Sequence, residues 1–370
     1  MTMTPEAPPS DVPPSSRGAW WYAGLALFAA TAALAIFVFY LGGFSFLLSD
    51  SSASFTVEWV LAQARVHPEA SAIVLGNSTA AEGFRPNWFK SHGTGAVALN
   101  LGVPSGWIYL WQRMFETVLG YGIRPRSAIV MLTPEIVSST DFDFLLNDLA
   151  MLKTVVGARD LVSLAPYAAS PRHYVDYAVD VVARPVLFRA EMRDFVTHPI
   201  GRLREAKHVH DWIHTFTRQS PMIETDNKAS VCEAEPLRQL DQTIEKYRGE
   251  NNPLLADLER VKAGYSIRVH QPLRLDARKM ELLRRLLAEI SAHHITPFVT
   301  EAPFWDPDFD QYPEAYRNQF SAAVRRIVES VPGAVYLPKL DVDCTMMLDT
   351  VHLNRKGGEI FTEYLGSRVL

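Results

Sequence analysis

A serine, an aspartate and a histidine stand in two short loops, in a combination that suits nucleophilic chemistry. Ser78 lies in the sequence GNST, and Asp349 and His352 lie in DTVH. A serine hydroxyl is a weak nucleophile until a base takes its proton, and histidine supplies that base when a carboxylate fixes its tautomer. The three residues therefore predict acyl transfer through Ser78. The alternatives are an ordinary polar turn at GNST and, at DTVH, a helix start capped by Asn354.

The segment NLGVPSG, residues 100–106, contains two glycines that could complete such a site. Acyl transfer develops an oxyanion, which backbone N–H groups stabilise. A glycine brings its N–H close to a ligand because it has no Cβ atom in the way. We expect Gly106, and after it Gly102, to donate to the oxyanion; a simple tight turn is the alternative for both.

The elements that must position these loops alternate between strand and helix. Short apolar runs typical of buried parallel strands occupy 71–75, 96–101, 127–132, 295–300 and 334–337. Helical spacing occupies 55–66, 105–120, 276–294, 312–331 and 355–370. This alternation predicts an α/β fold with a parallel sheet between helices, and ligands bind beyond the carboxyl ends of such strands.

Two further side chains follow the strand predicted at 295–300 and could line the same edge of the sheet. Glu301 directly follows this strand, and Trp305 comes four residues later. An indole can stack on a sugar ring, although an aromatic residue packed under a loop is the more common case. Asn77, beside Ser78, is a third candidate for contact with a substrate.

The stretch from 138 to 267 loses the strand rhythm and predicts a helical insertion. It includes HVHDWIH, with His208, His210 and His214 on one segment. The spacing matches no strong zinc pattern, so a partly exposed helix face is the preferred interpretation and no metal is expected.

The N-terminal region predicts a membrane anchor. Residues 1–17 are rich in proline, serine and threonine and predict a disordered cytoplasmic tail, whereas 18–49 contain no charged residue. A helix that crosses a bilayer needs roughly 20 apolar residues, so 18–49 predict a transmembrane helix that leaves 50–370 outside the cytoplasm. A cleaved signal peptide is the alternative, but this run is longer than the usual apolar region of one.

Charge and cysteine content narrow the remaining possibilities. The net charge of −5 gives no reason to expect nucleic acid as a partner. Cys232 and Cys344 are the only two cysteines. Outside the cytoplasm they could form a disulfide, and two separate buried thiols are the alternative.

Taken together, the loops resemble the conserved blocks of the SGNH (GDSL-like) hydrolase superfamily. GNS resembles the nucleophile block, with Asn77 where aspartate is usual, and NLGVPSG resembles the glycine-bearing second block. DTVHLNRKGG resembles the last block, which supplies the aspartate and histidine. The resemblance covers roughly 70–135 and 275–370.

The third block departs from the superfamily pattern, in which an asparagine contributes to the oxyanion hole. Here the third predicted strand ends MLTPEIV, without asparagine. With the predicted anchor and insertion, this is more similar to the cell-envelope branch that includes the D-alanine transfer protein DltD and the alginate O-acetylation proteins AlgJ and AlgX. The resemblance implies that Thr133 takes the third-block position, where its hydroxyl or a neighbouring N–H could assist.

This resemblance implies a flavodoxin-like three-layer fold and a function at the inner membrane, with the catalytic domain in the periplasm. The expected activity is serine O-acyltransfer, most simply of acetyl, to a surface polysaccharide or glycolipid without any cofactor. A multispanning membrane acyltransferase is the expected partner. An esterase that removes the same groups and a non-catalytic carbohydrate-binding scaffold of an export complex are the alternatives.

Overall fold

The computed structural model of the protein describes residues 16–41, 54–92, 95–138, 144–219, 227–228, 230, 232, 236–249, 274–305, 314–349 and 351–369. The 370-residue chain is longer than these ranges, and the account below concerns the described residues.

A five-stranded, all-parallel sheet with the order β2-β1-β3-β4-β5 forms the centre of the fold. The strands are β1 (Ala72–Leu75), β2 (Ala98–Asn100), β3 (Ser127–Leu132), β4 (Thr296–Glu301) and β5 (Val335–Leu337). In the register, Leu75 pairs with Val130 and Leu132 pairs with Glu301. The predicted α/β class with a parallel sheet is therefore confirmed.

Helices cover both faces of the sheet because alternate strand residues point to opposite sides. In β1, Ile73 and Leu75 belong to one buried cluster, and Ala72 and Val74 belong to another. The first cluster includes residues of α2 (Phe55–Val66), α5 (Ile108–Gly120), α14 (Ala277–Ala292) and α15 (Glu314–Glu329). The second includes residues of α3 (Ser78–Gly83), α4 (Pro86–His92) and α16 (Arg355–Val369).

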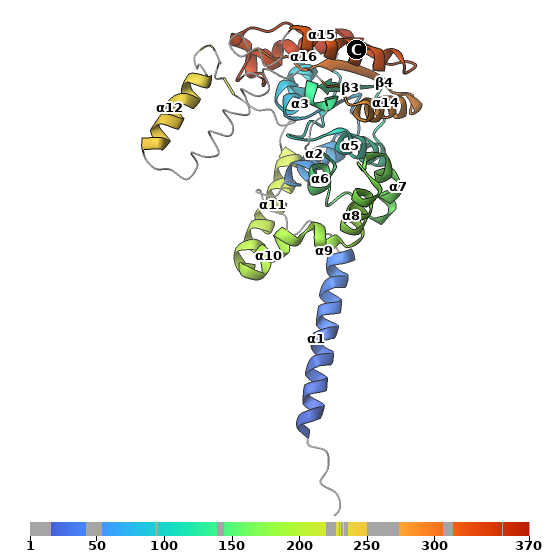
Figure 1. Ribbon diagram of the computed structural model, residues 1–370, viewed down its shortest axis with the longest axis vertical. Helices are drawn as coiled ribbons and strands as arrows, with labels where there is room; N and C mark the ends of the chain where they lie inside the picture. The colour runs from blue at the N-terminus through green and yellow to red at the C-terminus, as the bar shows by residue number, and fades with distance from the viewer. Residues whose placement is uncertain are drawn as a thin grey trace, which may run out of the picture.

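Between β3 and α14 the described residues form helices. The longer ones are α6 (Phe144–Met151), α8 (Pro171–Val182), α10 (Arg189–Thr197), α11 (Pro199–Gln219) and α12 (Pro236–Gly249). Single turns are η2 (Pro134–Ile136), η3 (Ala158–Asp160), α7 (Leu161–Leu164), η4 (Ala165–Tyr167) and α9 (Arg184–Leu187). Helices α6 and α8–α10 lie below the sheet in the view of Figure 1.

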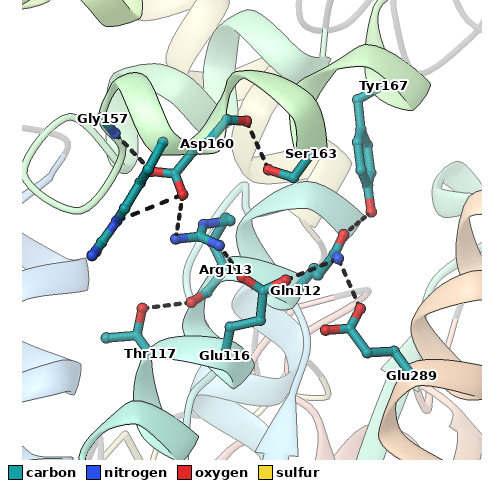
Figure 2. A network of polar contacts seen from close by, with 10 residues as sticks. Gln112, Arg113, Glu116, Thr117, Gly157, Asp160, Ser163, Tyr167 and Glu289 are labelled. Carbon is teal, nitrogen blue, oxygen red and sulfur yellow. Dashed lines mark hydrogen bonds and ion pairs between the residues drawn. The ribbon is translucent and has the colours of Figure 1, made fainter. Parts of the chain in front are cut away.

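A buried polar network joins these helices to the sheet-covering ones (Figure 2). Gln112 of α5 donates to Glu289 of α14 at 2.7 Å and accepts a hydrogen bond from the hydroxyl of Tyr167. Beside it, Arg113 of α5 pairs with Asp160 at 2.9 Å, and both side chains are almost fully buried. Separation of the buried Arg113–Asp160 pair would leave each charge buried without its partner, which is costly. These contacts therefore hold the insertion against α5 and α14.

Helix α11 is held against α2 by aromatic side chains. The Trp212 ring lies 4.3 Å from the Trp59 ring and 5.4 Å from the Phe55 ring, measured between centroids. His208 and His210 are exposed on the same helix. No group of three potential metal ligands occurs among the residues described by the structure.

Cys232 and Cys344 form a disulfide with a Cα–Cα distance of 5.0 Å. Of the two alternatives that the sequence leaves open, the structure shows the bonded one. Cys344 begins the turn η5 (Cys344–Met346), and its carbonyl accepts a hydrogen bond from Ser230 at 3.0 Å. The disulfide therefore connects the segment between α11 and α12 to the turn η5 that precedes α16.

Helix α1 (Ser16–Leu41) projects away from the rest of the molecule, with one end beside α9 (Figure 1). Residues 1–15 and 42–53, which hold most of the predicted tail and the end of the predicted anchor, lie outside the described residues. Among the described residues, no helix combines the length and the apolarity that a bilayer crossing demands. The anchor at 18–49 stays a prediction.

Candidate active site

Ser78 stands at the point where β1 turns into α3. The turn is Gly76-Asn77, and a Cβ atom added at Gly76 would lie 2.5 Å from the Cβ atom of Ala80, so the chain needs glycine there. Asn77 caps the helix by accepting a hydrogen bond from the N–H of Thr79 at 3.1 Å. Ser78 is thus the first helical residue at the carboxyl end of β1, and it is partly exposed.

Asp349 and His352 lie in the loop between η5 and α16, and Asn354 holds this loop in place. The buried Asn354 side chain donates to the carbonyl of Thr345 at 2.9 Å and accepts from the N–H of Gly357 at 3.0 Å. It therefore joins the start of α16 to η5 across the loop. The helix-capping role considered for Asn354 is present together with the aspartate–histidine pair and does not compete with it.

The three residues form one chain of hydrogen bonds. His352 Nε2 lies 2.8 Å from Ser78 Oγ, and His352 Nδ1 lies 2.8 Å from Asp349 Oδ2. The other carboxylate oxygen of Asp349 accepts from the backbone N–H groups of Val351 and His352, each at 2.8 Å. These two backbone bonds fix the carboxylate so that Oδ2 faces the imidazole. The arrangement lets the imidazole take a proton from Ser78 while Asp349 holds the opposite ring nitrogen.

Electrostatics favour a charged imidazole next to a charged carboxylate. Burial opposes protonation of His352, yet the hydrogen bond and charge of Asp349, helped by the charge of Glu82, raise the pKa of His352. Burial acts on Asp349 in the opposite sense, but the hydrogen bonds and charge of His352 and the N–H of Val351 lower the pKa of Asp349. The carboxylate therefore stabilises the imidazolium that forms when Ser78 gives up its proton.

Glu82 is a charged neighbour of this site that the sequence did not reveal. It lies four residues after Ser78 on α3, so both occupy the same face of one helical turn. Burial raises the pKa of Glu82; the charge of His352 opposes this rise and the charge of Asp349 adds to it. Had a helix been predicted after Ser78, the spacing of four residues would have indicated that Glu82 lies beside Ser78.

Both glycines predicted to form the oxyanion hole have N–H groups that are already engaged. The N–H of Gly102 donates to the side-chain oxygen of Asn100 at 2.9 Å, and the N–H of Gly106 donates to the carbonyl of Val103 at 2.9 Å. In this structure each glycine therefore belongs to a tight turn, which is the alternative considered for both. At Gly102 an added Cβ would lie 2.4 Å from the backbone nitrogen of Ala81, so glycine is needed for packing against α3.

Two other donors lie where strands β1 and β3 end. As the first residue of α3, Ser78 has an N–H group without a partner inside the helix. Thr133 directly follows β3, and its hydroxyl oxygen accepts from the side chain of Asn77 at 3.1 Å. Because a hydroxyl that accepts one hydrogen bond still has its own proton to donate, Thr133 keeps a donor at this edge. Asn77 thus connects the two loops through its amide.

Glu301 and Trp305, the two side chains predicted to line the site, both make contacts within the fold. Glu301 is buried, and its carboxylate accepts from Ser321 at 2.8 Å and from the hydroxyl of Tyr336. Through these two hydrogen bonds, Glu301 links β4 to α15 and β5. Trp305 packs against the buried cluster that contains Met347 and Leu353, which is the packed alternative for this aromatic side chain.

A cavity of about 310 Å³ opens on the α5 and α14 side of the sheet, and its lining includes none of the three hydrogen-bonded residues above. Trp107 and Ile136 contribute to its wall from the segments that follow β2 and β3. Asp148 is among the lining residues, and burial raises the pKa of this carboxyl to about 8 although three backbone N–H groups oppose that rise. Burial lowers the pKa of Lys279, another lining residue, to about 8.

No protein-family model and no curated protein matches this chain. The residues that the structure brings together, Ser78, His352 and Asp349, therefore carry the argument about function.

Proposed function

We propose that the protein is a serine enzyme of the SGNH type that acts on acyl esters. The hydrogen-bonded chain from Ser78 through His352 to Asp349 is the observation that carries this proposal. The strand order β2-β1-β3-β4-β5 is that of flavodoxin-like sheets, which bind ligands where the order reverses between β1 and β3. Ser78 follows β1 and Thr133 follows β3, so this position supports the proposal.

The reaction begins when His352 Nε2 accepts the hydroxyl proton of Ser78 and Ser78 Oγ attacks the ester carbonyl carbon. The N–H of Ser78 and the hydroxyl of Thr133 are the donors we assign to the oxyanion that develops on the carbonyl oxygen. Asp349 stabilises the imidazolium, which then protonates the departing alcohol as the carbonyl re-forms. The product is acyl-Ser78 with a neutral His352.

The second half repeats these steps with a new nucleophile. His352 takes the proton of an incoming hydroxyl, this hydroxyl attacks acyl-Ser78, and the imidazolium returns the proton to Ser78 Oγ. A sugar hydroxyl gives O-acyl transfer, whereas water gives hydrolysis. We propose transfer of an acyl group, most simply acetyl, to a surface polysaccharide or glycolipid, with a multispanning acyltransferase as the partner that supplies it. Resemblance and the anchor predicted at 18–49 support this choice.

Labelling with a fluorophosphonate tests the nucleophile without knowledge of the substrate. We expect the wild-type chain to be labelled and Ser78→Ala to lose the label. Ser91→Ala, which changes an exposed serine on α4, is the matched control and should keep it. An unlabelled wild type, or a label that persists in Ser78→Ala, would overturn the proposal and favour the non-catalytic scaffold.

An ester assay with and without an acceptor sugar distinguishes transfer from hydrolysis. A chromogenic acetyl ester is incubated with the protein, with and without an oligosaccharide, and the acetylated sugar is measured by mass spectrometry. A transferase forms the acetylated sugar and releases the chromophore faster when the acceptor is present. Chromophore release that no acceptor changes would favour the esterase.

A further inference from the structure

The corner between α10 and α11 carries aliphatic side chains that point into solvent. Val196 is 77% exposed, Ile200 72% and Leu203 50%. Helix α10 ends at Thr197 and α11 begins at Pro199, so these side chains surround a single bend in the chain. Single exposed aliphatic residues are normal on a protein surface, but a cluster on one protruding corner marks a contact surface.

The opposite side of the corner is anchored to the molecule, so the exposure is a fixed property of the fold. Arg202 is buried, and one of its guanidinium nitrogens lies 3.4 Å from Asp194 and 3.3 Å from Glu205. Ala206 and Val209, on the same face of α11, are also buried. The spacing of 202, 206 and 209 turns that face inward and leaves Ile200 and Leu203 on the outer surface.

The corner is basic, whereas the whole chain is acidic. Residues 189–211 contain five basic and four acidic side chains, a net charge of +1, against −5 for the chain. Arg193, Arg204 and Lys207 are exposed beside the aliphatic side chains. Asp194 and Glu205 pair with Arg202, and Asp211 pairs with Lys207 at 3.3 Å, so Arg193 and Arg204 supply the positive charge beside the aliphatic side chains.

The position of the corner relates it to the predicted membrane anchor. Helix α1 contacts α9, which directly precedes α10. Figure 1 shows α9 and α10 at the end of the molecule from which α1 projects. If α1 enters a bilayer, the corner lies at the level of the adjacent headgroups.

We propose that the α10–α11 corner docks on an anionic phospholipid surface, with Val196, Ile200 and Leu203 among the headgroups and the basic side chains on the phosphates. Apolar side chains flanked by lysine and arginine are typical of helices that lie in the membrane interface. The docking rests on the proposed membrane anchoring. It fixes the orientation of the domain on the membrane and is independent of the chemistry at Ser78.

Lipid quenching of a fluorophore tests this contact in the full-length chain. Ile200→Cys and, as a control on β5, Val335→Cys are labelled through the new thiol, because Cys232 and Cys344 are already bonded to each other. Each variant is placed in nanodiscs of phosphatidylcholine and phosphatidylglycerol that contain a headgroup-attached nitroxide lipid. We expect quenching about twofold or more stronger at 200 than at 335, and weaker quenching at 200 without phosphatidylglycerol.

Each outcome decides the proposal. Equal quenching at the two positions means that the corner does not reach the lipid, and its occupant is then a protein. Quenching at 200 that persists without phosphatidylglycerol refutes the anionic preference. A chain that does not enter the discs refutes the anchor together with the docking. Fluorophosphonate labelling of Ser78 in the same discs reports the proposed chemistry separately.

Discussion

Replacement of Asp349 by asparagine should disable the nucleophile without removing any atom of the serine or histidine. In the native loop one carboxylate oxygen accepts two backbone N–H bonds at 2.8 Å, and the other faces His352 Nδ1 at 2.8 Å. The asparagine carbonyl will occupy the place with two donors, because this keeps both backbone bonds. Its NH₂ group then donates to Nδ1, so the proton of the neutral ring moves to Nε2. An Nε2–H cannot accept the proton of Ser78.

The size of the effect follows from the cost of turning this amide around. The reversed amide would lose two backbone hydrogen bonds, a cost of about 2–3 kcal/mol. The productive tautomer then falls to about one molecule in a hundred, since about 1.4 kcal/mol corresponds to a factor of ten. Loss of the charge beside the imidazolium slows the reaction further. We expect a total decrease of about 10²–10⁴, the upper end being typical of a triad aspartate.

The second-order rate constant for fluorophosphonate labelling of Ser78 measures this effect across pH. Asp343→Asn is the control, since Asp343 caps η5 just upstream of the loop that holds Asp349 and lies outside the hydrogen-bonded chain. The control should stay within about threefold of wild type, because surface changes have small effects. If Asp349→Asn reacts within about tenfold of wild type while folded, Asp349 does not set the tautomer, and the proposed role of the triad is wrong.

Three further perturbations have expected outcomes. Glu82→Gln removes a charge that raises the pKa of His352, so the acidic limb of the labelling profile should move to lower pH; an unmoved limb would exclude this coupling. Asp148→Ala removes the acceptor of the buried N–H of Leu110 and of the part-buried N–H of Trp107, which should lower the free energy of unfolding in urea by about 2–4 kcal/mol, and Asp148→Asn should lower it less. Cys232→Ser opens a disulfide whose partner, Cys344, is 112 residues away, so the same measurement should show a decrease of about 2–4 kcal/mol; no change would mean that the cross-link does not restrain the unfolded chain.

Much of the sheet could be predicted because its strands are continuous apolar runs that end at polar loops. The strand predicted at 127–132 is β3 at the same residues, the one predicted at 71–75 begins one residue before β1, and the one predicted at 295–300 is shifted by one residue from β4. A strand that is buried on both faces is a continuous apolar run, so its first and last residues are clear in the sequence. Ser78 and His352 could be predicted for the same reason. Residues that follow the strands, and those just before the last helix, lie together at the carboxyl edge of the sheet.

The contacts of Gly102 and Gly106 could not be predicted from their positions in the sequence. A glycine in a strand-to-helix loop suits either close approach to a ligand or close approach to the protein itself. Gly102 serves the second purpose, since its Cβ position is filled by the backbone of α3, and α3 was not among the predicted elements. The role of Asn77 as a link to Thr133 is likewise a tertiary contact, between residues 56 positions apart.

The exposure of the triad bears on the choice between hydrolysis and transfer. The side chains of His352 and Asp349 are 20% and 45% exposed. Within the described part of the chain, water can therefore reach His352, the base that would take its proton. An acyl-serine intermediate at such a site is hydrolysed unless something covers it. A transferase made from this site therefore depends on its acceptor or its partner to exclude water. The isolated chain should then hydrolyse a simple ester even if transfer is its function in the assembly, and the acceptor arm of the ester assay is the measurement that distinguishes the two activities.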